Sequence, residues 1–546
     1  MASSKLQEFI EETENKEILR FVTIGSVDDG KSTLIGRLLH DTNAVYEDQL
    51  SAVKSASTQN VDQGEIDFAL ITDGLKAERE QGITIDVAYR YFATKKRKFI
   101  IADTPGHVQY TRNMATGAST ADVALILIDA RHGVLPQTRR HAYISSLLGI
   151  YGLLVCVNKM DLKDYDEAVF EKIKKDMEAV TANMGFGDIQ FIPVSALKGD
   201  NVVTSSANTP WYKGPTVLEY LETIQVPKDD LASHFALPVQ LVIRPHLNFR
   251  GFAGRIISGS IQVADEIMVL PSEKTSRVKE ILLYKENLHE AVAGQSIVLT
   301  LEDEIDISRG DMLVHPNHSF TISNRFRAKM VWLDENPLKL NRQYYLKHTT
   351  NSAVGVVNQV NQILNIESLQ FESSDKPLKL NDIAEVTITV NRPLIADLYR
   401  NNRQAGAFIL IDRITNQTSG AGMIAEFLDD LSAEQEEEFL EKVSREEKEA
   451  RLNQKGYLVQ VVAPTEQEAF QKAVSLERLL FDRGYFPIFI EKEDIAQKLL
   501  PFAKENALLI LIPKVGKKLA IQIEDKEVKI KHLADALSVI QKEIEK

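Results

Sequence analysis

The sequence predicts an α/β domain with a phosphate-binding loop, followed by two β-barrels and a small C-terminal α/β domain. Three observations support this fold class. A glycine-bounded loop, residues 25–33, lies between a strand-like run at 21–24 and a helix-like run at 34–39. Near-continuous apolar runs at 123–129 and 153–157 are typical of parallel strands buried on both faces. From about residue 232, short apolar runs alternate with turn residues, which indicates small barrels.

Composition narrows the class of protein. The chain has 546 residues, which favours about three or four domains. Its net charge of −14 argues against a broad nucleic-acid surface. One cysteine, Cys156, excludes a disulfide framework or a cysteine-based metal site. The N-terminus is polar and acidic, and no run of about 18 apolar residues occurs. We therefore expect a soluble cytoplasmic protein with no nucleic-acid or membrane partner.

The loop at 25–33 has the residue types that hold a nucleotide triphosphate. Gly25 and Gly30 allow the backbone to turn around an anion and direct N–H groups towards it. The following helix adds its N-terminal donors. Lys31 is expected to reach the β- and γ-phosphates, and the Ser32 hydroxyl to bind Mg²⁺. The predicted nucleotide-binding residues of this loop are Gly25, Ser26, Val27, Asp28, Asp29, Gly30, Lys31, Ser32 and Thr33.

Two later segments have the properties of nucleotide-sensing switches. A long polar region at about 41–81 ends just before Thr84. In GTPases the first switch lies in such a region, and its threonine binds Mg²⁺ through the hydroxyl and the γ-phosphate through the backbone N–H. Thr84 is our candidate for that threonine. A buried strand at 99–102 is followed by Asp103, Thr104, Pro105, Gly106 and His107. Asp103 is expected to hold the Mg²⁺ hydration shell and Gly106 to donate its N–H to the γ-phosphate. His107 is expected to orient the attacking water; the alternative is a buried structural histidine.

Two strand ends predict the choice of base. The strand at 153–157 leads into Asn158, Lys159, Met160 and Asp161, and the strand at 191–194 leads into Ser195, Ala196 and Leu197. The Asp161 carboxylate can accept both N1–H and the exocyclic amine of guanine, whereas adenine would leave it unpaired. Asn158 is expected to connect the loops, Lys159 to lie along the ring, and the Ala196 N–H to donate to guanine O6. These elements, each at a strand end, predict a guanine-nucleotide switch.

The rest of the chain divides by composition. We expect a GTP-binding domain at 17–230, β-barrel domains at 231–324 and 325–430, a charged linker at 431–454 and a small α/β domain at 455–546.

The motifs at 25–33, 103–107 and 158–161, followed by two barrels, resemble the elongation-factor class of translational GTPases. Residues 25–39, 103–117, 244–245, 249–251, 345–348 and 418–424 resemble more closely the GTPase subunit family (subunit 1) of bacterial sulfate adenylyltransferase. The resemblance covers roughly residues 15–430. It implies GTP and Mg²⁺ as ligands and catalytic roles for His107, Thr84 and Lys31. It further implies a smaller catalytic subunit that binds ATP and sulfate and transfers the adenylyl group of ATP to sulfate. GTP hydrolysis on this chain would then drive the formation of adenosine 5′-phosphosulfate and diphosphate.

The C-terminal segment departs from the fused members of that family, which carry an adenylylsulfate kinase there. Residues 457–494 resemble the first part of such a kinase, but the phosphate loop reads Ala463 to Phe470 without its glycines, lysine or hydroxyl residue. Glu466 and Glu468 would repel phosphate. We therefore expect a degenerate kinase-like domain. Two other readings of the whole chain remain open: a translational GTPase that binds aminoacyl-tRNA, and a non-catalytic scaffold.

Overall fold

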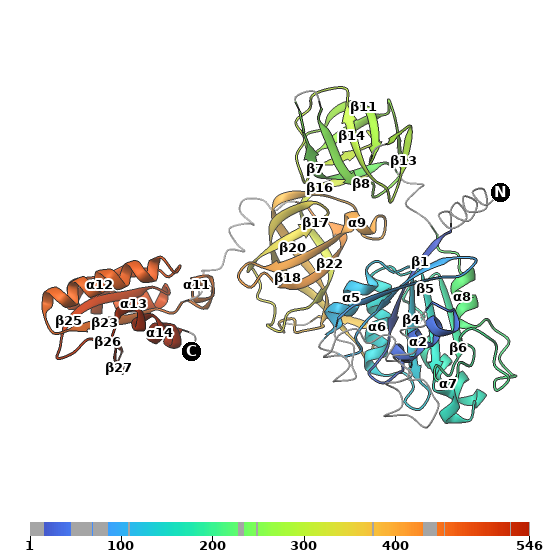
Figure 1. The fold of residues 1–546 in the computed structure, drawn as a ribbon, viewed down its shortest axis with the longest axis horizontal. Helices are drawn as coiled ribbons and strands as arrows, with labels where there is room; N and C mark the ends of the chain where they lie inside the picture. Colours follow the sequence, from blue (N-terminus) through green and yellow to red (C-terminus); the bar gives the residue numbers. More distant parts are fainter. Residues whose placement is uncertain are drawn as a thin grey trace. The chain divides into compact units, whose positions relative to one another are not determined.

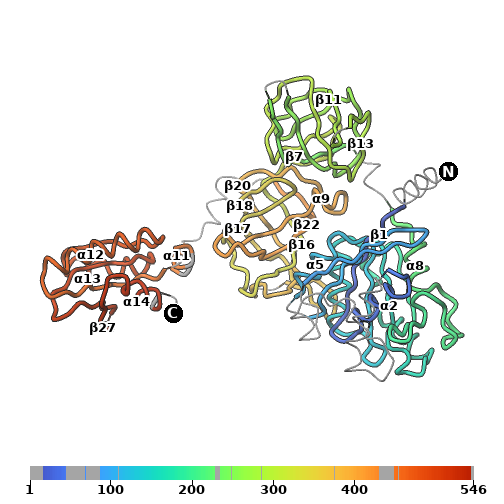
Figure 2. The backbone as a smooth tube through the Cα atoms, in the orientation of Figure 1, coloured from blue at the N-terminus to red at the C-terminus, as the bar shows by residue number. Residues whose placement is uncertain are grey.

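The computed structural model describes residues 16–44, 68, 86–107, 110–227, 234–246, 249–284, 286–373, 376–429, 445–452, 454–524 and 526–544. Thr84 lies outside this part of the chain. The chain forms two compact units: residues 1–413 with 417–430, and residues 414–416 with 431–546. Figure 1 labels their helices and strands, and Figure 2 traces the backbone of each. No helix in the described part of the chain is long and apolar enough to cross a membrane.

The first domain of the larger unit is a six-stranded sheet covered by helices on both faces (Figure 1). Its strands lie in the order β2 (Ala88–Ala93), β3 (Lys98–Asp103), β1 (Ile18–Ile24), β4 (Val123–Asp129), β5 (Gly152–Asn158), β6 (Asp188–Pro193). All neighbours are parallel except β2 and β3. Every residue of β4 and β5 is buried, as the apolar runs predicted. The carboxyl ends of these strands therefore gather at one edge, where ligands of open α/β sheets bind.

Two apolar layers attach the helices to this sheet. One layer joins α5 (Thr111–Ala118), α6 (Pro136–Leu147) and α7 (Glu167–Thr181) to one face. The other joins α2 (Lys31–Asp41) and α8 (Val217–Thr223) to the opposite face. A short 3-10 helix, η3 (Met160–Lys163), follows β5. Because α2 and η3 each begin at a strand's carboxyl end, their first residues lie at the edge where the candidate site is expected.

Two antiparallel barrels follow, as predicted. In the first, six strands close a ring in the order β10-β15-β7-β8-β14-β11, and β12 extends it. Its elements are β7 (Ala236–Ile243), β8 (Gly251–Arg255), β9 (Ser260–Gln262), β10 (Glu266–Leu270), β11 (Lys274–Leu283), β12 (Glu286–Leu288), β13 (Glu290–Val292), β14 (Ser296–Leu301) and β15 (Met312–Val314).

The second barrel closes in the order β17-β21-β22-β16-β20-β18, with β19 beside β18. Its elements are β16 (Thr321–Trp332), β17 (Gln343–His348), β18 (Asn351–Asn365), β19 (Gln370–Glu372), β20 (Ile383–Ala396), α9 (Arg403–Gly406), β21 (Ala407–Asp412) and β22 (Thr418–Phe427). Leu333, Ile383 and Met423 of this barrel join the apolar layer of the first domain. The Tyr399 hydroxyl donates to the Leu148 carbonyl at 2.9 Å. The second barrel is thus packed directly on the helices that follow the switch segment.

The smaller unit is a five-stranded sheet in the order β24-β25-β23-β26-β27. Its elements are α11 (Arg445–Leu452), β23 (Tyr457–Ala463), α12 (Glu466–Phe481), β24 (Pro487–Phe489), α13 (Glu493–Glu505), β25 (Leu509–Val515), β26 (Ala520–Ile523), β27 (Lys526–Lys529) and α14 (Leu533–Ile544). The three strands β24, β25 and β23 are parallel, whereas β26 and β27 return antiparallel. The α/β character expected for this segment is confirmed, and the antiparallel half has no counterpart in the sequence prediction.

Candidate nucleotide-binding site

The loop between β1 and α2 turns through left-handed backbone positions. Asp28 has φ 65° and Gly30, which caps α2, has φ 91°. A Cβ on Gly30 would lie 2.5 Å from Asn158 Nδ2. Both the conformation and the space therefore require glycine at this position. The consequence is that the loop reverses direction tightly and presents the N-terminus of α2 to its interior.

Lys31 and Asp29 fill the interior of this loop. The Lys31 ammonium donates to the carbonyls of Gly25 at 3.1 Å and Ser26 at 2.7 Å. Burial lowers the pKa of Lys31, although the carboxylates of Asp29, Asp103 and Asp28 act in the opposite direction. The partners of this desolvated ammonium are neutral carbonyls, so phosphate oxygens would be stronger acceptors for it.

The Asp29 side chain forms a hydrogen bond within the phosphate loop, a contact that the sequence pattern does not predict. Its Oδ2 accepts from the Ser26 N–H at 2.6 Å, and burial raises the pKa of the Asp29 carboxyl. The Asp29 carbonyl accepts from Asn158 Nδ2 at 2.7 Å. Asp29 was predicted as a phosphate-cradle residue on its position alone. In this structure its side chain bonds to the loop backbone, and its main chain joins the loop to the end of β5.

The segment after β3 lies against the same loop. Asp103 pairs in register with Thr23 of β1, whose hydroxyl donates to Asp103 Oδ1 at 3.2 Å. A Cβ on Gly106 would lie 2.6 Å from Lys31 Nζ and 2.8 Å from the Gly25 carbonyl. Only glycine fits this approach, which brings the Gly106 backbone beside the lysine that is expected to bind the β- and γ-phosphates. His107 is half-buried beside Tyr110, with ring centroids 6.2 Å apart.

The protein oxygen atoms at this site could hold Mg²⁺ only together with the oxygen atoms of a bound phosphate. No three His, Cys, Asp or Glu side chains of the described residues gather into a metal site. The Asp103 carboxylate and the Ser32 hydroxyl, at the start of α2, are the oxygen donors that Mg²⁺ prefers. Mg²⁺ usually keeps several waters and binds one or two protein oxygens together with substrate phosphates. This donor set agrees with that pattern.

Asn158 connects three of the predicted elements. Its Nδ2 reaches the phosphate loop at Asp29, and its Oδ1 accepts from the Ala196 N–H at 2.9 Å. The side chain is 2% exposed, so both hydrogen bonds lie away from water. The loops after β1, β5 and β6 are therefore held in one arrangement by one amide. Asn158 was predicted to connect these loops, and the structure contains the contacts that such a role needs.

Lys159 lies beside a carboxylate that the sequence reasoning missed. Its Nζ is 3.1 Å from Asp129 Oδ2 and also donates to the Asp28 carbonyl. Burial would raise the pKa of Asp129, but hydrogen bonds from Arg131 and Lys159 hold it well below its usual range. Asp129 is the last residue of β4, so its position at a strand end was the available signal.

The other predicted residues after β5 and β6 differ in how deeply they are buried. Met160 is fully buried in the core below the site, and Asp161 is half-buried in the first turn of η3. The Ser195 hydroxyl accepts from the Lys198 N–H at 3.2 Å. Leu197 is 42% exposed, and its carbonyl accepts from Arg37. Met160 thus supports the loop from beneath, whereas Asp161 has the exposure that a base contact requires.

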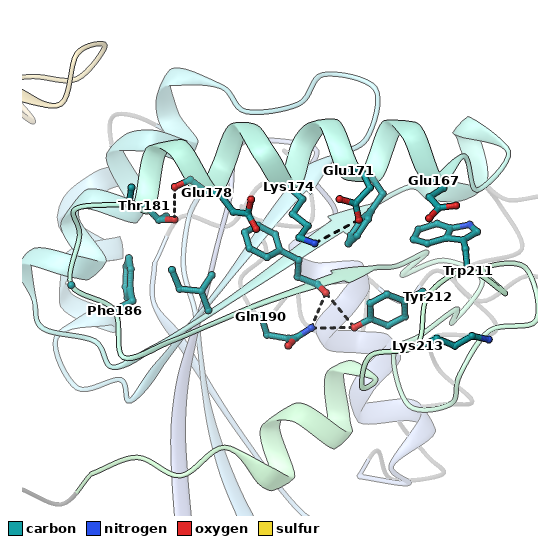
Figure 3. Close-up of a pocket in the computed structure, with 15 residues that line it drawn as sticks. Glu167, Glu171, Lys174, Glu178, Thr181, Phe186, Gln190, Trp211, Tyr212 and Lys213 are labelled. Atoms are coloured by element: carbon teal, nitrogen blue, oxygen red, sulfur yellow. Dashed lines mark hydrogen bonds and ion pairs between the residues drawn. The ribbon is translucent and has the colours of Figure 1, made fainter.

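A separate cavity of about 590 Å³ lies in the same domain (Figure 3). Figure 3 shows Trp211 and Tyr212 across from the carboxylates of α7, where Glu171 is 3.6 Å from Lys174. The Tyr212 hydroxyl donates to the Phe191 carbonyl at 3.2 Å. None of the predicted nucleotide-binding residues lines this cavity. It is therefore distinct from the candidate nucleotide site.

His141 is a buried titratable group on α6. Burial lowers its pKa to about 3, with smaller contributions from Lys31 and Arg140. The unfolded chain binds this proton below its ordinary pKa of about 6.5. Folding therefore opposes protonation, and the stabilising effect of a neutral His141 is lost as the pH falls from 6.5 towards 3. We expect the wild type to lose roughly 1 kcal/mol more stability than His141→Gln between pH 7.5 and 5.5. Urea unfolding at both pH values measures this, and equal losses would contradict it.

Two parts of the chain match known protein families, and most of its length is similar to named proteins. Residues 16–236 match the family described as the elongation factor Tu GTP binding domain, and residues 325–425 match the GTP-eEF1A C-terminal domain-like family. Sulfate adenylyltransferase subunit 1 of Cellvibrio japonicus (strain Ueda107) is 54% identical over 436 residues, 80% of this chain and 92% of that protein. The bifunctional enzyme CysN/CysC of Rhodopirellula baltica (strain DSM 10527 / NCIMB 13988 / SH1) is 48% identical over 512 residues, 91% of this chain and 79% of that protein. Among solved structures, Sup35 complexed with GDP is 23% identical, with a TM-score of 0.36, over 76% of this chain and 95% of that one.

Proposed function

The chain belongs to the sulfate adenylyltransferase subunit 1 family, and we propose that it couples GTP hydrolysis to the formation of adenosine 5′-phosphosulfate by a partner subunit. It is a GTPase subunit of sulfate activation. In the coupled reaction, a sulfate oxygen attacks the α-phosphorus of ATP, and the bond from that phosphorus to the bridging oxygen of diphosphate breaks. The resulting phosphate–sulfate anhydride is strongly uphill in free energy. An independent hydrolysis is the kind of reaction that can drive its accumulation.

The structural observation that carries the GTP-driven part of this proposal is the close approach of Gly106 to the phosphate loop. A Cβ on Gly106 would lie 2.6 Å from Lys31 Nζ, so the switch segment and the phosphate-binding lysine share one space. A γ-phosphate held by Lys31 would accept the Gly106 N–H, and its departure would remove that hydrogen bond. The segment from Asp103 to His107 would then relax, which is how this chain would report hydrolysis.

The predicted residues at the centre of the site have separate roles in this proposal. Lys31 and the loop N–H groups bind the phosphates, Asp161 reads the guanine edge, and Asn158 holds the loops. Asp103 and Ser32 would hold Mg²⁺ together with Thr84. Bound Mg²⁺ would neutralise the charge that develops on the β- and γ-phosphate oxygens. His107 would position the attacking water, and it is half-buried beside Tyr110, so part of the residue is exposed to solvent.

His107→Ala is expected to separate binding from turnover. Removal of a water-orienting group should slow GTP hydrolysis by about 10² or more, while GTP affinity stays within a few-fold. Single-turnover hydrolysis and nucleotide titration measure the two quantities. His289→Ala, an exposed histidine of the first barrel, is the matched control and should match the wild type in both. A His107→Ala hydrolysis rate equal to that of the wild type would remove His107 from the mechanism.

We infer that residues 455–546 carry no phosphotransfer activity. Only Pro464 and Thr465 separate β23 from α12, which is too short a connection to wrap around a phosphate. Thr465 caps α12 by accepting from the Glu468 N–H at 3.2 Å. The carboxylates of Glu466 and Glu468 lie in the first turn, where an anion would otherwise be attracted. The 512-residue match to the bifunctional CysN/CysC enzyme supports a relation of this segment to that protein's later part.

The proposal is tested by identifying what the chain binds. We expect it to co-purify with a smaller subunit, and the complex to release diphosphate from ATP only when sulfate is present. The chain alone should release none, because the site proposed to hydrolyse a nucleotide is expected to select guanine. An aminoacyl-tRNA-binding GTPase would instead bind charged tRNA in a GTP-dependent way. Such binding, without any sulfate-dependent release of diphosphate from a complex, would overturn the proposal.

A further inference from the structure

A second pocket in the larger unit lies between α5 and the two barrels. Its volume is about 890 Å³, which is within the range of small-molecule sites. Arg112 and Thr116 of α5 line it from the first domain, and Arg255 at the end of β8 lines it from the first barrel. Lys347 of β17 and Arg403 of α9 line it from the second barrel. None of the predicted nucleotide-binding residues belongs to this pocket.

The charge of this pocket is opposite to that of the whole chain. Its lining contains four cationic side chains, Arg112, Arg255, Lys347 and Arg403, and no aspartate or glutamate, whereas the chain carries a net charge of −14. Within the described part of the chain, no salt bridge joins Arg112, Arg255 or Lys347 to a carboxylate. The Arg403 guanidinium donates to the Gly149 carbonyl, which leaves its charge in place. Cations that line one pocket repel each other, and a bound anion would reduce that repulsion.

The other wall residues define the size and character of the anion. Leu333, Phe408 and Met423 give the pocket an apolar side suited to a ring system. Thr116, Thr349 and Gln404 add neutral hydrogen-bonding groups. A single inorganic anion would leave most of this volume and the apolar wall unused. We propose that the pocket binds a nucleotide-sized organic polyanion, with a ring on the apolar wall and its phosphate or sulfate groups on the four cations.

This pocket is mechanically connected to the proposed GTP site. Helix α5 starts at Thr111, four residues after His107. A Cβ on Gly117 of α5 would lie 2.7 Å from Thr104 Cγ2, so the helix packs closely on the switch segment. A ligand bound to Arg112 and Thr116 would therefore contact the helix that packs on the segment proposed to sense the γ-phosphate. This part of the inference rests on the proposed function. The packing of α5 on the switch segment predicts that the pocket ligand and the guanine nucleotide change each other's affinity by the same factor.

The test uses the full chain saturated with GDP, so that the GTP site is occupied. Adenosine 5′-phosphosulfate, ATP, inorganic diphosphate and adenosine are titrated separately by calorimetry. At least one of the two charged nucleotides should bind more tightly than diphosphate or adenosine. The double variant Arg255→Gln/Lys347→Gln should weaken that binding by about tenfold or more, since two charge-assisted hydrogen bonds are lost. Lys279→Gln, an exposed lysine of the first barrel, is the matched control and should bind as the wild type does.

The same titrations contain the outcomes that would overturn the inference. Failure of both charged nucleotides to bind, or equal affinity in the double variant and the wild type, would do so. If the double variant instead loses affinity for the catalytic subunit or for 5′-phosphorylated tRNA while no nucleotide binds, the surface is a macromolecular contact. An unchanged GDP affinity in the double variant verifies its fold. If neither charged nucleotide binds while GTP still raises product formation by the wild-type complex, the inference alone has failed and the proposed function stands.

Discussion

Asp161→Asn is expected to exchange the base preference of the nucleotide site. An asparagine amide cannot accept both guanine donors, so affinity for GTP should fall by roughly 100-fold or more. Xanthosine triphosphate should gain affinity, because its ring presents an acceptor where guanine has the amine. Asp161 is half-buried in the first turn of η3, just beyond the left-handed Lys159 at φ 61°. A polar contact in that place is partly shielded from water and therefore costly to lose.

Fluorescence titration with labelled guanine and xanthine nucleotides measures this exchange. Asp176→Asn is the matched control: it makes the same chemical change on the exposed side of α7, in the same domain. The control should keep the affinity of the wild type for both nucleotides. If Asp161→Asn also keeps wild-type GTP affinity, Asp161 does not read the base.

Lys31→Ala is expected to abolish tight triphosphate binding. Lys31 is 7% exposed and its ammonium donates to two loop carbonyls, so a phosphate would receive a desolvated, charge-assisted donor. Loss of that donor should weaken GTP binding by about 100-fold, and GDP binding by less if the γ-phosphate is a partner. The loop carbonyls of Gly25 and Ser26 would also lose their donor, which adds to the effect.

The control for this change is Lys175→Ala, an exposed lysine on α7. Its affinity for GTP and GDP should equal that of the wild type. Circular dichroism of Lys31→Ala should match the wild type, because the hydrogen bonds of the lysine are to two loop carbonyls and not to the sheet or the helices. Equal GTP affinity in Lys31→Ala and Lys175→Ala would contradict the phosphate role of Lys31.

The parts of the fold that follow from periodicity and turn chemistry could be predicted. Strands β4 and β5 are apolar at nearly every position, so their burial in a parallel sheet follows from the sequence. The barrels could be predicted as short strands, but each ring also depends on pairings between residues far apart in sequence, such as β17 with β21 and β16 with β22. The antiparallel return of β26 beside β23 likewise depends on tertiary packing, which no local pattern encodes.

In the candidate site, too, some residues could be predicted from local sequence, whereas others depend on tertiary contacts. Gly30 and Gly106 could be predicted because a tight approach to an anion demands glycine. The carboxylates could be assigned only by position. Asp29 was expected in the phosphate cradle, but its Oδ2 accepts from the Ser26 N–H within the loop. Asp129 was overlooked, because its contact with Lys159 forms only when β4 and β5 lie side by side. Contacts between neighbouring strand ends are properties of the folded sheet.

GTP turnover on this chain is expected to raise the amount of anhydride formed by the partner. The most direct measurement is the final extent of adenosine 5′-phosphosulfate formed from ATP and sulfate by the complex, with and without GTP. For the wild type, GTP should raise that extent. With Lys31→Ala, GTP should have no effect, while the basal reaction of ATP and sulfate continues on the other subunit. An extent that is the same with and without GTP in the wild-type complex, or a GTP effect that survives in Lys31→Ala, would contradict the claim.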